Sequence, residues 1–313
     1  MTHVAPSAPD DFALLRRQAG AALRTLLQPG AYLGALREGA HTAVHVAAYP
    51  LGLVGRSPLP EKLGDLLPTE GAAAMPVVLI HGYVHNRSAF LMMSRALKRA
   101  GFGWVHGLNY NPIRHGIGEL AGMLATEIER VLEASGAEKV AVIGHSMGGI
   151  VARHYVQALG GEDTVDTVIT LGAPHRGSYS AYLGIGPAAV EMRPGSPFLC
   201  ELEATARPGP VRYVAYYSDL DFMVLPAVNA KLIHPALRAT NIRLRHTGHL
   251  SLLLSGEVIR GVLEHLSDPE LDRPGDLAEV AALPTASQRR RAVPRTAELE
   301  PTIAIGNEQA ARQ

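Results

Sequence analysis

The sequence predicts an α/β fold in which a mostly parallel sheet is covered by helices on both faces. Between residues 75 and 267, short apolar runs rich in β-branched residues alternate with longer segments whose apolar residues recur at helical spacing. The runs are apolar almost throughout, as in strands that are buried on both faces. Six strand–helix steps of this kind indicate a parallel sheet, because parallel strands need a crossover connection.

Each strand is expected at one of these apolar runs, and four of the other segments have the spacing of a helix. The expected strands are residues 76–82, 103–110, 139–142, 165–172, 211–218 and 241–249. The expected helices are residues 88–101, 116–136, 150–159 and 256–266. Ser88 is the expected N-cap of the first of these helices, and Gly101 is its expected end.

The same patterns divide the chain of 313 residues into three zones. We expect a helical extension over residues 1–74, the α/β domain over residues 75–267 and a disordered tail over residues 268–313. Within the extension, residues 10–28 place apolar side chains on one helical face. We interpret them as a helix packed on the body of the protein, with an amphipathic helix that lies on a membrane surface as the alternative.

Charge and composition argue against nucleic acid, a metal ion and structural disulfides. The 29 basic residues balance the 29 acidic ones, so no basic surface is expected to attract nucleic acid. The single cysteine, Cys200, cannot form an internal disulfide. The 14 histidines are scattered, and the closely spaced His81 and His85 fall in a loop after a strand, so we expect no metal site.

The N-terminal stretch does not resemble a signal peptide. It lacks a basic region followed by an apolar one, and Asp10 and Asp11 stand where a signal peptide would be apolar. No apolar run reaches the roughly 18 residues that a membrane span needs. We therefore expect a cytoplasmic protein, with peripheral membrane association through residues 10–28 as the alternative.

The stretch "IGHSMGGIV" places Ser146 between a predicted strand and a predicted helix. Glycines at positions 144, 148 and 149 surround it and would relieve the crowding of side chains at a sharp corner. This is the pattern of the G-x-S-x-G nucleophile elbow, which exposes a serine hydroxyl at the carboxyl edge of a parallel sheet. The sequence therefore predicts that Ser146 is a nucleophile.

A serine nucleophile needs a base and an acid, and in this arrangement they follow the ends of later strands in the order serine, acid, histidine. Two acids, Asp219 and Asp221, follow the strand expected at residues 211–218, and this position alone does not separate them. For the base, His249 lies in the loop before the last helix, whereas His246 is expected at the end of the strand. We therefore expect His249 to be the base.

The oxyanion that forms when serine attacks an ester needs backbone N–H donors that are already in place. One donor is expected from Met147, the residue after the nucleophile. The other is expected from Tyr83, in the loop after the first strand, where Gly82 allows the backbone to come close. His81 is expected to position this loop rather than to take part in the chemistry.

Five segments together resemble the lipase branch of the α/β-hydrolase superfamily, and they are most similar to small bacterial triacylglycerol lipases and their esterase relatives. They are "VVLIHGYVHNRSAF", "VIGHSMGGIVAR", "TLGAPHRGS", "YYSDLDFMVLP" and "TGHLSLLLSGEV". The resemblance implies that Ser146, Asp221 and His249 form a catalytic triad and that Tyr83 and Met147 donate to the oxyanion. It implies a serine carboxylester hydrolase that cleaves acylglycerols or other lipid-like esters without a cofactor.

Two alternatives share these residues: an acyltransferase or thioesterase on the same scaffold, and a non-catalytic hydrolase fold that binds lipid. The segment 178–210 is short and contains five prolines, which argues against a long helical lid and favours short-to-medium acyl chains. Apolar residues of this segment are interpreted either as the wall of an acyl pocket or as ordinary packing: Tyr179, Tyr182, Leu183, Ile185 and Phe198.

Overall fold

The computed structural model describes residues 28–53, 74–268 and 280–281. The predicted helix at residues 10–28 lies outside the described residues except for its last position. The predicted tail at residues 268–313 likewise lies outside them, apart from residue 268 and two residues that pair with the sheet.

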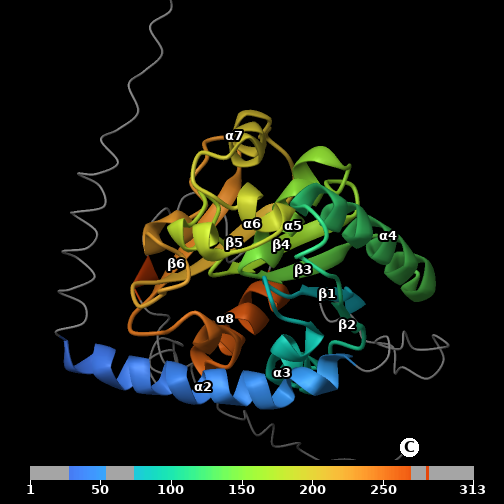
Figure 1. Cartoon of the computed structure of the whole chain (residues 1–313). Helices are drawn as coiled ribbons and strands as arrows, with labels where there is room; N and C mark the ends of the chain where they lie inside the picture. The colour runs from blue at the N-terminus through green and yellow to red at the C-terminus, as the bar shows by residue number, and fades with distance from the viewer. Residues whose placement is uncertain (1–27, 54–73, 269–279, 282–313) are drawn as a thin grey trace, which may run out of the picture. The chain divides into compact units, whose positions relative to one another are not determined.

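The described strands form one seven-stranded sheet in the order β2-β1-β3-β4-β5-β6-β7, and every neighbouring pair is parallel (Figure 1). The strands are β1 Val77–Ile80, β2 Val105–Leu108, β3 Val140–His145, β4 Val165–Leu171, β5 Arg212–Ser218, β6 Arg238–Leu244 and β7 Val280–Ala281. This confirms the predicted parallel sheet. Ile80 pairs in register with Gly144, so the loops that follow β1 and β3 start side by side at the carboxyl edge.

Helices cover both faces of the sheet (Figure 1). The described α-helices are α2 Pro29–Leu53, α3 Leu91–Arg99, α4 Ile117–Ser135, α5 Met147–Ala158, α6 Pro187–Glu191, α7 Pro197–Ala204 and α8 Gly256–Ser267. Short 3-10 helices are η3 Arg87–Phe90, η4 Tyr179–Leu183, η5 Ala227–Ala230 and η6 Leu250–Leu253.

Alternate residues of each strand point into two separate cores. Val78 and Ile80 of β1 pack in one core with the apolar faces of α4 and α5. Val77 and Leu79 pack in the other core with α3 and α8. Because both faces of the sheet are covered in this way, the central strands β1 and β3 to β5 are buried along almost their whole length, as the sequence pattern indicated.

Two sequence predictions differ from the structure in detail. Ser88 is not a helix cap, because it lies inside η3 and donates its backbone N–H to the side chain of Asn86, which is the N-cap. The sixth strand ends at Leu244, so His246 lies beyond the strand. Pro187 and Pro197 begin the short α6 and α7, because proline fits the first turn of a helix, and the absence of a long helix in these two places agrees with what the prolines indicated. The expected end of α3 is confirmed, since Gly101 follows it with a φ of 97°.

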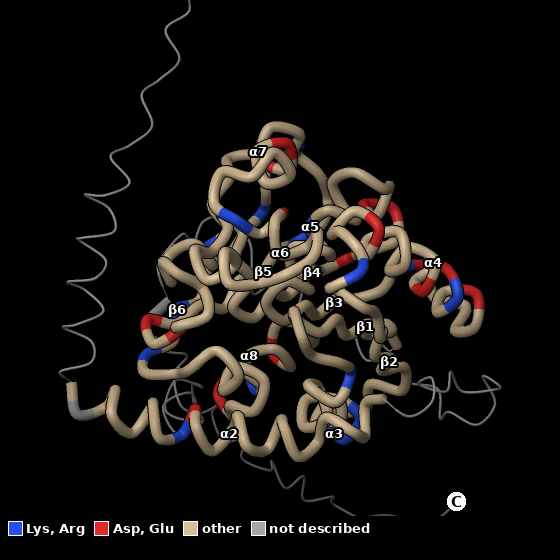
Figure 2. Tube along the Cα trace, viewed as in Figure 1, with Lys and Arg blue, Asp and Glu red and all other residues tan. Residues whose placement is uncertain are grey.

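Helix α2 is turned so that its small and polar residues face the body of the protein. Ala31, Gly34 and His45 are buried, and the helix contacts the segments around η3 and η6. Tyr32, Leu33 and Leu36 on the outer face are 69%, 59% and 57% exposed. Figure 2 shows α2 nearly free of charge, since Arg37 and Glu38 are its only ionised residues. No described helix, α2 included, combines the length and apolarity that crossing a membrane requires.

Helix α5 passes directly against the end of β1. A Cβ atom at Gly148 would lie 2.4 Å from the carbonyl oxygen of Ile80, and one at Gly144 would lie 2.5 Å from the backbone nitrogen of Gly149. No real Cβ atom tolerates such contacts, so both positions require glycine. The glycines of the elbow therefore set how closely the helix approaches the sheet.

We predict that Gly148→Ala destabilises the protein by about 1–3 kcal/mol, because the new methyl group meets rigid backbone. Gly122→Ala in α4 is the matched control, since a Cβ there meets nothing within 4 Å. The control should instead stabilise the protein by up to about 1 kcal/mol through helix propensity. Urea unfolding measures both changes, and an unchanged free energy of unfolding for Gly148→Ala would contradict this packing.

Candidate active site

Ser146 lies at the corner between β3 and α5 in a backbone conformation that side chains rarely adopt. Its φ and ψ are 54° and −127°, whereas a residue with a side chain normally avoids positive φ. Strain of this kind costs on the order of 1–3 kcal/mol and is concentrated at functional sites. A hydrogen bond of 2.8 Å from the Ser146 backbone N–H to the carbonyl oxygen of Leu171 holds the corner.

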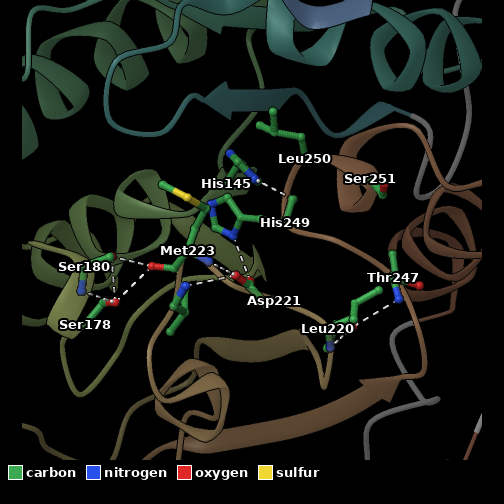
Figure 3. A network of polar contacts seen from close by, with 12 residues as sticks. His145, Ser178, Ser180, Leu220, Asp221, Met223, Thr247, His249, Leu250 and Ser251 are labelled. Carbon is green, nitrogen blue, oxygen red and sulfur yellow. Dashed lines mark hydrogen bonds and ion pairs between the residues drawn. The ribbon is translucent and has the colours of Figure 1, made fainter. Parts of the chain in front are cut away.

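The structure brings His249 and Asp221 together from two loops at the same edge of the sheet (Figure 3). Nδ1 of His249 lies 2.7 Å from Oδ2 of Asp221, and both side chains are buried. The second oxygen, Oδ1, accepts backbone N–H bonds of 2.9 Å each from Met223 and Val224. The carboxylate is therefore fixed by the backbone on one side and orients the imidazole on the other.

Asp219, the other acid that follows β5, lies elsewhere. Its Oδ1 accepts the backbone N–H of His246 at 2.9 Å, and its Oδ2 lies 3.6 Å from the guanidinium of Arg243. Of the two acids that the sequence left open, the structure brings Asp221 to His249.

The ring of His249 also lies beside the elbow. Its centroid is 4.6 Å from the ring of His145, the residue directly before Ser146. Nε2 of His145 lies 3.2 Å from the carbonyl oxygen of His249, and in the tautomer that carries its hydrogen on Nε2 it donates to that oxygen. Burial lowers the pKa of His145 well below its usual value, so its ring is neutral. This contact was missed from the sequence, where His145 appeared only as a flanking residue of the motif.

Opposing influences act on the pKa of His249. Burial lowers it, but the charge and the hydrogen bond of Asp221 raise it, as does the charge of Glu38 in α2. The net result is a pKa above the ordinary value of 6.5. The imidazole can thus hold a proton near neutral pH, as a general base must do during turnover.

Tyr83 follows Gly82 in the loop after β1, and Met147 is the first residue of α5. Outside helices and strands, no backbone hydrogen bond in the described part of the chain is donated by the N–H of either residue. Gly82, next to Tyr83, approaches the nucleophile closely, since a Cβ at this position would lie 2.9 Å from Cβ of Ser146. The loop after β1 and the start of α5 therefore meet at the serine.

His81 and Tyr110 hold the loop after β1 in place. Nδ1 of His81 lies 2.8 Å from the carbonyl oxygen of Gly82, and its ring stacks on Tyr110 at a centroid distance of 4.0 Å. Burial lowers the pKa of His81 to about 4, so it is neutral at physiological pH. These contacts are those of a residue that positions the loop.

The segment after β4 supports the loop that carries the acid (Figure 3). Oγ of Ser178 donates to the carbonyl oxygen of Met223 at 2.9 Å and accepts the backbone N–H of Leu225 at 2.8 Å. Ser180 donates to the same carbonyl oxygen at 2.5 Å. The last residue of the "APHRGS" stretch thus holds the loop that carries Asp221 through its bonds to Met223 and Leu225.

Apolar side chains are exposed on the loops that carry the site residues and on the segment after β4. They are Val84, Tyr182, Leu183, Ile185, Phe222, Met223 and Leu225. The hydroxyl of Tyr83 ties two of these loops together, since it donates to the carbonyl oxygen of Ile185 and accepts that residue's N–H. Phe198 differs, because its ring packs 5.0 Å from the ring of His154 on α5.

Among the residues that the structure describes, no three His, Cys, Asp or Glu side chains are grouped so as to hold a metal ion.

A parallel sheet with a serine elbow after β3, an acid after β5 and a histidine after β6 is the arrangement of the α/β-hydrolase fold. Comparison with known proteins agrees. The family model of palmitoyl protein thioesterase matches residues 76–206. A triacylglycerol lipase of Pseudarthrobacter phenanthrenivorans is 34% identical over 122 residues, which cover 35% of this chain and 36% of that protein.

A triacylglycerol lipase of Burkholderia plantarii is also 34% identical over 122 residues, covering 35% of this chain and 32% of that one. The matches thus span about a third of the length of these relatives. Two solved structures share the fold. The mature lipase of Bacillus licheniformis has a TM-score of 0.54 at 20% identity, covering 66% of this chain and 97% of that one.

Lipase B of Aspergillus fumigatus has a TM-score of 0.56 at 18% identity, covering 70% of this chain and 61% of that one. The fold and these similarities confirm that the chain resembles the lipase and esterase branch of the α/β-hydrolase superfamily.

We predict that His249 titrates above pH 6.5, whereas His81 stays neutral down to about pH 4. Asp221→Asn should lower the pKa of His249, because it removes the carboxylate that stabilises the protonated ring. NMR titration of the imidazole signals, assigned with single histidine substitutions, measures these values. The account of the pair would be wrong if His249 titrated below 6.5 or did not respond to Asp221→Asn.

Proposed function

We propose that the protein is a serine carboxylester hydrolase of the lipase or esterase type, with Ser146, His249 and Asp221 as its catalytic triad. The observation that carries the proposal is the buried hydrogen bond between His249 and Asp221 at the edge of the sheet where the strained, half-buried Ser146 lies. A base that is held by a carboxylate beside a serine is the arrangement that activates a hydroxyl.

In the first step, Oγ of Ser146 attacks the carbonyl carbon of the ester while Nε2 of His249 takes the hydroxyl proton. Asp221 holds the imidazole through Nδ1 and stabilises the positive charge that develops on it. The negative charge on the former carbonyl oxygen accepts hydrogen bonds from the N–H groups of Tyr83 and Met147. The bond to the alcohol then breaks, the imidazolium returns its proton to the leaving oxygen, and an acyl-enzyme remains.

In the second step, water takes the place of the alcohol. His249 removes a proton from the water molecule, whose oxygen attacks the acyl carbon. The same two N–H groups stabilise the second oxyanion. The bond to Ser146 Oγ breaks, the serine recovers its proton from the imidazolium, and the carboxylic acid leaves. No step needs a cofactor.

We further propose that the substrate is an acylglycerol or another lipid-like ester. The similar proteins from Pseudarthrobacter and Burkholderia are triacylglycerol lipases. The exposed apolar side chains on the loops around the site, such as the 89% exposed Leu183, suit a substrate with an acyl chain. The helices of the segment after β4 are only five and eight residues long, which agrees with a preference for short-to-medium chains.

A thioesterase is the second candidate, because the thioesterase family model matches residues 76–206. A thioester would react with the same residues and release a thiol in place of an alcohol. Comparison of kcat/KM for an oxygen ester and a thioester of the same acyl chain separates the two. A marked preference for the thioester would favour the second candidate.

We predict that Ser146→Ala and His249→Ala abolish measurable hydrolysis of medium-chain nitrophenyl esters. Asp221→Asn should lower kcat on the order of 10³–10⁴-fold, because the imidazole loses its orienting carboxylate. Asp219→Asn is the matched control and should cost far less, since its carboxylate bonds His246 and Arg243 instead. The reverse ranking of the two asparagine variants would assign the acid to Asp219, and an active Ser146→Ala would refute the triad.

A further inference from the structure

Helix α2 is packed unusually closely on the loop that carries His249. A Cβ atom at Gly34 would lie 2.4 Å from the backbone oxygen of His246, so this face of the helix touches the loop directly. From the other side, a Cβ at Gly248 would lie 2.2 Å from Oε2 of Glu38. Glycine at both positions therefore allows this close contact, since Gly34 meets the backbone of the loop and Gly248 meets the side chain of Glu38.

The carboxylate of Glu38 accepts three hydrogen bonds from the two residues that follow His249. Oε1 accepts the backbone N–H of Leu250 at 2.8 Å. Oε2 accepts the backbone N–H of Ser251 at 2.9 Å and its hydroxyl at 2.6 Å. Hydrogen bonds to an ionised acceptor are about twice as strong as neutral ones, so this contact can fix a loop.

Two histidines of α2 extend the contact. Nδ1 of His41 lies 2.8 Å from Oγ of Ser251, and Nε2 of His45 lies 3.3 Å from the carbonyl oxygen of Leu250. Burial is the main cause that lowers the pKa of each ring below its usual value. The two imidazoles are therefore neutral near neutral pH and add no positive charge to the contact.

The peptide group between His249 and Leu250 is held at both ends. Its carbonyl oxygen faces Nε2 of His145 at 3.2 Å, and its N–H donates to Glu38 at 2.8 Å. A peptide plane that is fixed on both sides cannot rotate, and its rotation would swing the side chain of His249 away from the serine. The two partners come from β3 and from α2, which are far apart in the sequence.

We propose that Glu38 is a positioning residue for His249: its carboxylate fixes the backbone of Leu250 and Ser251 and thereby holds the imidazole between Asp221 and Ser146. The inference rests on the proposed triad. It gives α2 a function, because the helix presents Glu38 to the site from a segment of the chain that precedes β1.

In the described part of the chain, three ionisable groups from three segments contact His249 or act on its charge: Asp221 from the loop after β5, His145 from β3 and Glu38 from α2. His145 is neutral, whereas the charge of Glu38, like that of Asp221, raises the pKa of His249. Loss of the Glu38 charge should therefore extend activity to lower pH, because the base remains unprotonated there. A residue that only stabilised the fold would not move the acid limb of the pH profile of activity.

The test compares Glu38→Gln and Glu38→Ala with the full-length wild type, using kcat, KM and the pH dependence of kcat/KM on a nitrophenyl ester. We expect kcat to fall about 10–100-fold, since small misplacements of a catalytic group have effects of this size. KM should stay within about twofold, because Glu38 is proposed to orient the base rather than to hold substrate. The acid limb should move to lower pH.

Two further variants sharpen the test. Arg37→Gln, on the same helix but exposed, is the matched control and should behave like the wild type. Ser251→Ala keeps the charge of Glu38 and removes one of its three bonds, so kcat should fall less and the acid limb should stay in place.

Folded Glu38 variants with wild-type kcat and pH profile would overturn the proposal. Unfolding of both Glu38 variants would also overturn it, because the carboxylate would then be required for the fold rather than for the position of His249. Failure of the proposed function is a separate outcome: Ser146→Ala would remain active, whatever the Glu38 variants do.

Discussion

The close passage of α5 against the end of β1 is the constraint on which the candidate site depends. Gly148 allows the helix to approach the carbonyl oxygen of Ile80, and the short turn that results forces Ser146 to a positive φ. The same approach brings the backbone N–H of Met147 into the neighbourhood of the loop that contains Tyr83. One packing contact thus shapes the corner at Ser146 and brings together the two segments that carry the proposed oxyanion donors, and the buried sheet around it holds the strained corner in place.

The second half of the site is assembled from parts of the chain that have no local connection. Asp221 orients the ring of His249, while His145 and Glu38 hold the peptide group that follows it. Since the loop after β6 has no regular structure of its own beyond η6, these outside contacts define where the imidazole lies. A general base works only at the right distance, so the support of the loop belongs to the proposed mechanism as much as the ring does.

The sequence predicted what local patterns determine and missed what depends on distant contacts. The elbow was visible because its glycines, strand and helix are adjacent, and the histidine and both acids were visible because each follows a strand. The choice between Asp219 and Asp221 needed the family resemblance, since both stand at the same strand end. The inward face of α2 was not predictable: apolar periodicity favours burying Tyr32, Leu33 and Leu36, but these residues are exposed and Glu38 faces the loop at residues 250–251.

The central claim, that Ser146 is the nucleophile and that Tyr83 and Met147 stabilise the oxyanion, is tested most directly by a crystal structure of the protein treated with an alkyl fluorophosphonate. The account predicts a covalent bond from Ser146 Oγ to phosphorus, with one phosphoryl oxygen about 2.7–3.1 Å from the backbone nitrogens of Tyr83 and Met147. An adduct on another serine, such as Ser88 or Ser178, or a phosphoryl oxygen that points away from both nitrogens, would contradict it.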